Sequence, residues 1–269
     1  MIVDSMTLEE IHKELHNDAG NTMKTVDHRA AAFRSVVLKS RTFPVIRHYE
    51  CSTIGRKNRF FVKLMATKRG DYSNPYMESY CIYSRPEGLY CAILGHVEGF
   101  TVIMPPHFFS RYRERVVRDE QISGTDLIHL FMRRYWHFYF ANFPTDGREV
   151  FDTIEDVLAA EKVDLIGICT DGLVFGERIG DINLIKTIIP GRMLLKNQYP
   201  LYYGLYLGFK HELQTSYPEK VVDYALSLPD DYDVNPNWDK VEEYVEQFFE
   251  SREEKDYTIL SLKKTFKGV

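Results

Sequence analysis

Three side chains that can do chemistry together recur at intervals of four residues, namely His107, Arg111 and Arg115. In a helix, residues at i, i+4 and i+8 share one face. Pro105 and Pro106 come just before them, and proline favours the first helical turn, so we expect a helix to begin here. An imidazole can exchange a proton near neutral pH, and a guanidinium can hold an anionic oxygen. The spacing therefore predicts a site that moves a proton beside a bound phosphate group.

The charge around this segment supports an anion site. Four arginines fall within residues 111–118 of a chain whose net charge is −5. A local cluster of cations on an acidic background is typical of anion binding, and we expect Arg118 to contact phosphate as well. The start of a helix also disfavours a charged imidazole, which would keep His107 neutral as a base. The alternative is an ordinary amphipathic helix in which Glu114 pairs with Arg111 and Arg118.

A second segment matters in combination with this helix. The expected strand 183–189 ends in Ile185-Lys186-Thr187-Ile188. A His-x3-Arg-x3-Arg helix followed by a short meander with this ending resembles the metal-independent ribonuclease toxins of the RelE, barnase and colicin fold group. The resemblance covers residues 107–118 and 165–189.

That resemblance implies a compact antiparallel sheet packed on helices and cleavage of RNA without a metal or cofactor. It implicates His107, Arg111, Arg115 and Thr187 as catalytic residues, with Lys186 as a further phosphate contact. His107 would take the proton from a ribose 2′-OH while Arg111 and Arg115 stabilise the charge that develops on phosphorus. The products would be a 2′,3′-cyclic phosphate and a 5′-OH end.

Two other functions stay open at this stage. The same arginines could hold a nucleic acid or another phosphate-bearing ligand without turnover. Alternatively, the chain could be a protein-interaction module that uses the acidic helix expected at 238–255. A salt-dependent association without cleavage would favour the first of these two, since phosphate contacts weaken as salt rises.

Composition excludes several classes of protein. The 269 residues are 44% hydrophobic, enough for a sizeable core without staples. The four cysteines form no CxxC pair, which argues against a structural metal and a disulfide scaffold. His129 and His137 have no carboxylate between them on their helix face, so we interpret them as core or boundary residues rather than metal ligands. No leader or membrane-spanning pattern occurs, so we expect a cytoplasmic protein without a membrane partner.

The elements that must position the site follow from periodicity. Residues 7–39 are predicted to be helical, with a capping box from Thr7 to Glu10 and a break near Gly20. Four β-rich runs then predict an antiparallel meander: 59–67, 77–84, 89–96 and 100–104.

The second half repeats this alternation. Beyond the motif helix we expect a buried helix over 125–141 and a short helix over 154–162. A second meander follows at 165–170, 173–178 and 183–189, with Asp171-Gly172 as a hairpin turn. Further helices are predicted over 192–213, interrupted at Pro200 and Gly204, over 219–227, and over 238–255, capped by Asn237.

Together these elements predict an α+β fold. Its antiparallel sheet is built from two meanders and is covered by N-terminal and C-terminal helices. No repeat or linker divides the chain, so we expect a single domain over 1–269. Its parts would be a helical segment 1–43, the sheet and motif helix 44–191, and a helical segment 192–269.

Overall fold

The computed structural model describes residues 2–52, 58–94, 99–145, 156 and 159–250. The fold is α+β, as expected. The chain divides into two compact units. Unit 1 comprises Met1–Phe109, Gln121–Arg133 and Asp181–Ile185, and unit 2 comprises Ser110–Glu120, Arg134–Gly180 and Lys186–Val269. These units do not follow the expected limits at 43 and 191, and the single-domain organisation stays a prediction.

Unit 1 is built on a sheet in which β1 to β5 follow one another in chain order and β5 is followed by the first part of β9. The expected strands of the first meander are confirmed, and β1 is an additional strand that the sequence analysis did not predict. The strands are β1 (Val45–Ser52), β2 (Arg59–Ala66), β3 (Tyr76–Arg85), β4 (Gly88–Leu94), β5 (Thr101–Met104) and β9 (Ile182–Ile189).

The pairing of β5 with β9 corrects the expectation of a purely antiparallel sheet. The four pairs from β1 to β5 are antiparallel, but β5 and β9 are parallel, with Thr101 opposite Ile182. A parallel partner needs a long crossover, and nearly eighty residues separate these two strands in the chain. Local sequence patterns predict only the hairpins, so they could not predict the parallel pairing of β5 with β9.

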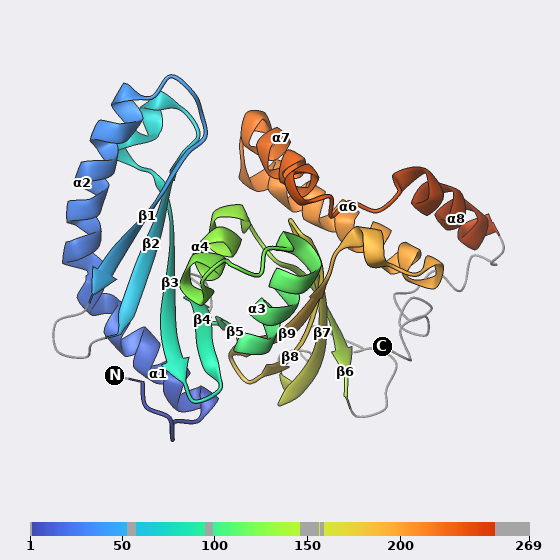
Figure 1. Ribbon diagram of the computed structural model, residues 1–269, viewed down its shortest axis with the longest axis horizontal. Helices are drawn as coiled ribbons and strands as arrows, with labels where there is room; N and C mark the ends of the chain where they lie inside the picture. Colours follow the sequence, from blue (N-terminus) through green and yellow to red (C-terminus); the bar gives the residue numbers. More distant parts are fainter. Residues whose placement is uncertain (1, 53–57, 95–98, 146–155, 157–158, 251–269) are drawn as a thin grey trace. The chain divides into compact units, whose positions relative to one another are not determined.

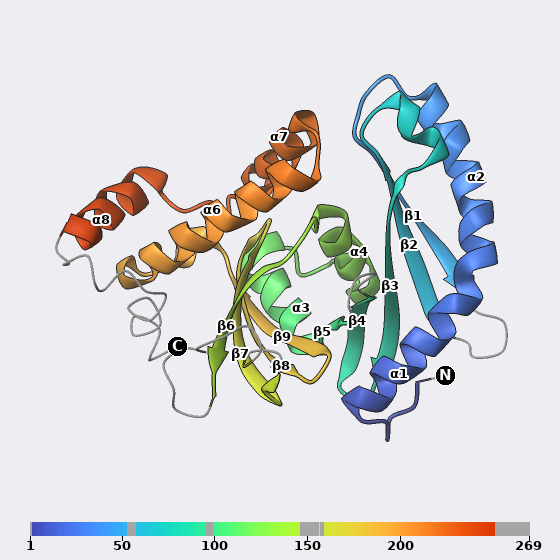
Figure 2. The ribbon, with the colours of Figure 1, turned by 180° about the vertical axis from the view of Figure 1, so that it is seen from behind.

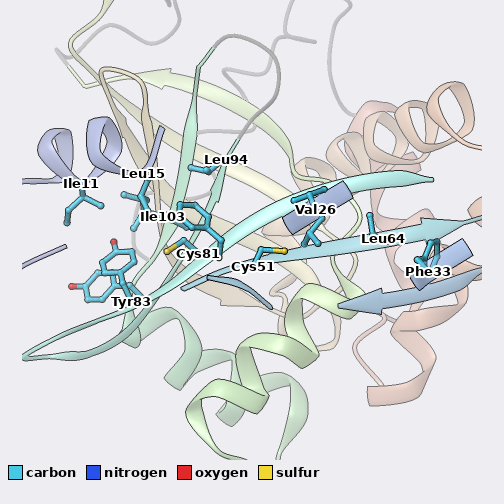
Figure 3. Packing of buried hydrophobic residues seen from close by; sticks show 14 of the residues in the cluster. Ile11, Leu15, Val26, Phe33, Cys51, Leu64, Cys81, Tyr83, Leu94 and Ile103 are labelled. Carbon is cyan, nitrogen blue, oxygen red and sulfur yellow. The ribbon is translucent and has the colours of Figure 1, made fainter. Parts of the chain in front are cut away.

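Helices α1 (Leu8–Ala19) and α2 (Met23–Lys39) cover one face of this sheet (Figure 1). The Thr7–Glu10 capping box begins α1, and a 3₁₀ turn, Gly20–Thr22, makes the expected break. Ile11 and Leu15 of α1 and Phe33 of α2 are fully buried in a cluster with side chains from the sheet (Figure 3). The predicted apolar faces of both helices therefore form the core of unit 1.

Helix α4 (Gly124–Arg134) is shorter than predicted. Of the residues expected to continue it, 135–138 are neither helix nor strand, and 139–141 lie in β6 (Tyr139–Pro144), which pairs with β7. The helix prediction over 125–141 is therefore wrong beyond Arg134. The segment is apolar on all sides, and such a run does not distinguish a buried helix from a strand.

Unit 2 carries the second meander, in the order β9, β8, β7, β6. Its strands β7 (Lys162–Cys169) and β8 (Gly172–Ile179) are joined at the Asp171-Gly172 turn, as predicted. Lys162 already lies in β7, so the short helix expected over 154–162 does not reach its predicted end. Asp156 and Ala159 are helical, and residues 154, 155, 157 and 158 lie outside the described residues.

Three helices of unit 2 follow the meander: α6 (Tyr199–Ser216), α7 (Glu219–Ser227) and α8 (Trp238–Glu250) (Figure 2). The expected start at residue 192 is wrong, because short 3₁₀ turns precede α6 and Pro200 occupies its first turn. Gly204 does not interrupt α6. Asn237 caps α8 by accepting a bond from Lys240 N–H at 3.1 Å. In the part of the chain described, none of the helices is both long and apolar enough to cross a membrane.

Candidate functional site

The predicted motif helix consists of two different kinds of helix. An α-helix, α3 (Pro106–Tyr112), passes into a π-helical turn, η3 (Arg113–Val117). The turn ends at Arg118, whose φ of +56° lies in the left-handed region. A π turn has i→i+5 bonds and therefore more residues per turn, so the expected single α-helical stripe through Arg115 and Arg118 is wrong. Both π turns and left-handed non-glycine residues are uncommon and occur often at functional sites.

Arg111 is held by a carboxylate. Its Nη1 lies 2.6 Å from Oε2 of Glu114, so the alternative that Glu114 compensates this arginine is confirmed. The expected second pairing of Glu114 with Arg118 is replaced by an ion pair of Arg118 with Asp233, at 3.7 Å. Arg111 therefore has less positive charge to offer a ligand than the sequence suggested.

Three other arginines come together where β9 ends, and we call Arg115, Arg118 and Arg192 the arginine cluster. Arg115 donates to the Ile188 carbonyl at 2.9 Å, and Arg192 donates to the Arg115 carbonyl. Burial and the nearby charge of Arg118 lower the pKa of Arg192, although Asp233 opposes this shift. The guanidinium groups of Arg118 and Arg192 are thus close enough to repel each other.

The charge of the arginine cluster is only partly compensated. Among the described residues, Asp233 is the only carboxylate in an ion pair with the cluster, and its side chain is 82% exposed. Half of the Arg118 side chain is exposed too. Mutually repelling cations beside solvent are stabilised when an anion binds between them.

Thr187 and Lys186 do not face the same side of β9, because successive residues of a strand point to opposite faces. Lys186 is exposed and pairs with Glu177 at 2.8 Å. Thr187 is half-buried and precedes Ile188, whose carbonyl binds Arg115. The structure therefore brings Thr187 to the strand end where the arginine cluster lies, and directs Lys186 to another surface.

His107 belongs to unit 1, whereas Arg111, Arg115 and Thr187 belong to unit 2. Its side chain is exposed in the first turn of α3. Within the described residues it has no hydrogen-bond or ion-pair partner. Its imidazole is therefore accessible to solvent.

Unit 1 contains a histidine network that the sequence analysis did not find. The Tyr80 hydroxyl lies 3.0 Å from Nδ1 of His48 and 2.8 Å from Nδ1 of His129. Burial, with the charges of Lys63 and other neighbours, lowers the pKa of His48 to about 3. His48 lies on the strand that was not predicted, so no local signal pointed to this contact. His129 is a boundary residue, as interpreted, and its partner is Tyr80.

A second histidine pair in unit 1 binds one threonine. Nδ1 of His12 and Nε2 of His16 lie 2.8 and 3.0 Å from the hydroxyl of Thr101, which is fully buried. One hydroxyl proton cannot be donated to both rings, so at least one ring must donate its N–H to the threonine oxygen. The i, i+4 spacing of the two histidines on a predicted helix was the available signal.

Other chemistry is limited in the part of the chain that the structure describes. It contains no group of three or more histidine, cysteine or acidic side chains arranged to hold a metal ion. All four cysteines are free and buried. His137, the other predicted boundary histidine, lies 2.8 Å from Glu212.

Comparisons with known proteins assign the chain to no family. Protein-family models, curated proteins and solved structures were compared with the chain, and none matches it. The resemblance to ribonuclease toxins stays a prediction.

Proposed function

We propose that this protein binds RNA by its phosphate groups, and that the arginine cluster in unit 2 is the contact. The observation that carries this proposal is the gathering of Arg115, Arg118 and Arg192 at the end of β9, with Asp233 as their paired carboxylate. Guanidinium groups bind phosphate oxygens through paired N–H donors, which favours arginine over lysine at such a site.

Binding without turnover fits this geometry better than catalysis does. Arg111 is engaged by Glu114, and Lys186 by Glu177. The cluster supplies cations that can hold a phosphate, and Thr187 beside it supplies a hydroxyl. This set suffices for an electrostatic contact that does not depend on base sequence.

The salt dependence of RNA binding tests the proposal. Affinity of the full chain for a single-stranded RNA should fall as salt rises, and Arg118→Gln should reduce the log–log slope by about 0.7, the value of one contact on a single strand. Arg59→Gln is the matched control, because Arg59 is also half exposed and also forms one ion pair, with Glu50 in unit 1. Equal slopes for Arg118→Gln and the unchanged protein would contradict the proposal.

A second candidate function is metal-independent ribonuclease activity. It is favoured by the imidazole of His107, which is exposed and has no partner among the described residues. In this proposal His107 removes the 2′-OH proton. His107→Ala should abolish cleavage and leave RNA affinity unchanged, with 2′,3′-cyclic phosphate ends in the products of the unchanged protein. RNA degradation that persists in His107→Ala would contradict the proposed ribonuclease activity and leave RNA binding as the proposed function.

A further inference from the structure

Unit 1 contains an open hollow of about 390 Å³ between the end of α2 and the start of β1, two segments that lie at the same end of this unit (Figure 1). Small-molecule sites commonly have volumes of about 300–1,000 Å³. Val36 of α2 and Val45 of β1 supply apolar surface to the hollow, and Val45 is 6% exposed. The volume and the apolar lining of this hollow suit the apolar part of a small organic molecule.

The charged side chains that line this hollow are both cationic. They are Lys39 and Arg47, and none of the described carboxylates lines it. Arg47 donates one hydrogen bond, to the Ile46 carbonyl at 2.7 Å, and neither cation forms an ion pair within the described residues. In a chain of net charge −5, two cations without carboxylate partners beside one hollow mark a place where a ligand can supply the missing negative charge.

The surroundings add to this charge. Arg69 donates to the carbonyl of Ser40, a lining residue, at 3.3 Å, which brings a third cation close. The end of α2 contributes about half a negative charge through its free carbonyl groups. That is less than the two full charges of Lys39 and Arg47, so the hollow remains attractive to an anion. Thr42 also lines it, and a threonine hydroxyl can hydrogen-bond to an anionic oxygen.

We propose that this hollow binds a small organic anion, with its phosphate or carboxylate on Lys39 and Arg47 and its apolar body against Val36 and Val45. The site shares no residue with the arginine cluster, and it lies wholly within unit 1. It therefore does not depend on the proposed RNA binding.

Calorimetric titration of the full chain with three probes tests the proposal. Phenyl phosphate and benzoate present the two anionic groups on an apolar ring, and inorganic phosphate presents the charge alone. We expect at least one ring-bearing probe to bind with a Kd of about 1 mM or tighter, and more tightly than inorganic phosphate. The ring-bearing probe that binds more tightly shows whether the site prefers a phosphate or a carboxylate group.

Lys39→Gln and Arg47→Gln should each weaken that probe about tenfold, the effect of one lost hydrogen bond to a charged group. Arg41→Gln is the matched control, because Arg41 is exposed between the same two elements but does not line the hollow. Arg118→Gln should also leave probe binding unchanged, which separates this site from the arginine cluster. Failure of both ring-bearing probes to bind, or equal weakening by Arg41→Gln, would overturn the proposal.

Discussion

Arg134 and Asp171 form a buried ion pair that joins the end of α4 to the β7–β8 turn. Their side chains are 3% and 2% exposed, and Nη2 of Arg134 lies 2.6 Å from Oδ1 of Asp171. Tyr112 donates a further bond to Asp171 at 2.7 Å, and Arg134 also donates to the Leu228 carbonyl. Burial alone would lower the pKa of Arg134, but the bonds and charge of Asp171 more than offset this and raise it. Hydrogen bonds on several sides make this burial tolerable.

Breaking this pair should be costly, because the buried charge of Arg134 would keep only the exposed carboxylate of Asp231, at 3.0 Å, as its ion-pair partner among the described residues. We expect Asp171→Asn to lower the free energy of unfolding by about 3–5 kcal/mol. The double variant, Arg134→Met with Asp171→Asn, lacks both charges. Its loss in free energy of unfolding should be smaller than the sum of the losses of the two single variants. Urea unfolding of the three variants measures this, and strictly additive effects would show that the two residues do not interact.

The hydroxyl of Tyr80 should stabilise unit 1, because it is the shared partner of His48 and His129. Tyr80→Phe leaves both imidazole nitrogens without that partner and should cost about 1–3 kcal/mol. Tyr83→Phe is the control, since the Tyr83 hydroxyl is buried and has no hydrogen-bond partner in the described part of the chain. In chemical denaturation, Tyr80→Phe should therefore lose more free energy of unfolding than Tyr83→Phe. Equal losses in the two variants would contradict a stabilising role for the histidine network.

Stability should fall in acid because His48 is neutral in the folded protein. Its folded pKa of about 3 lies below the ordinary value of 6.5, so the unfolded chain binds the proton first as pH falls. Each pH unit below the ordinary value should remove up to about 1.4 kcal/mol until the folded pKa is approached.

The matched variant for this pH effect is His48→Gln, which lacks the titrating group. Unfolding midpoints of both proteins between about pH 7 and about pH 4 should converge as pH falls, because only the unchanged protein loses the His48 contribution. A difference that stays constant with pH would show that His48 is not buried in its neutral form.

Gly172 should tolerate no side chain. Its φ is +139°, and an added Cβ would lie 2.7 Å from Cα of Pro190 and closer still to the Ile189 carbonyl oxygen. Gly180 also has a positive φ, +55°, but an added Cβ there meets nothing within 4 Å. Gly172→Ala should therefore destabilise more than Gly180→Ala, by more than about 2 kcal/mol in thermal or urea unfolding. Similar losses in the two variants would contradict the steric argument.

Local signals identified most of the elements. The capping box of Thr7 and Glu10, the Asp171-Gly172 turn and the Asn237 cap each act within a few residues, and all three occur as predicted. Where local patterns were ambiguous, the prediction failed, as in the apolar segment that leaves α4 and becomes β6.

The candidate site was less predictable than the fold. The basic segment 111–118 was correctly noticed, but its π turn and the partners of Arg111 and Arg118 follow from contacts with neighbours. Arg192, the third member of the cluster, lies more than seventy residues from Arg118 in the chain. No spacing rule links residues so far apart.

The sequence by itself determined the α+β class, the starts of α1, α7 and α8 and the hairpins, because short-range hydrogen bonds and apolar periodicity specify them. Only the tertiary structure decided that β9 runs parallel to β5, that Asp171 is a buried partner of Arg134 as well as a turn residue, and that Arg192 joins Arg115. Each of these depends on which distant segments share a core. Which distant segments pack together depends on the burial of the whole chain, and no single stretch of residues predicts it.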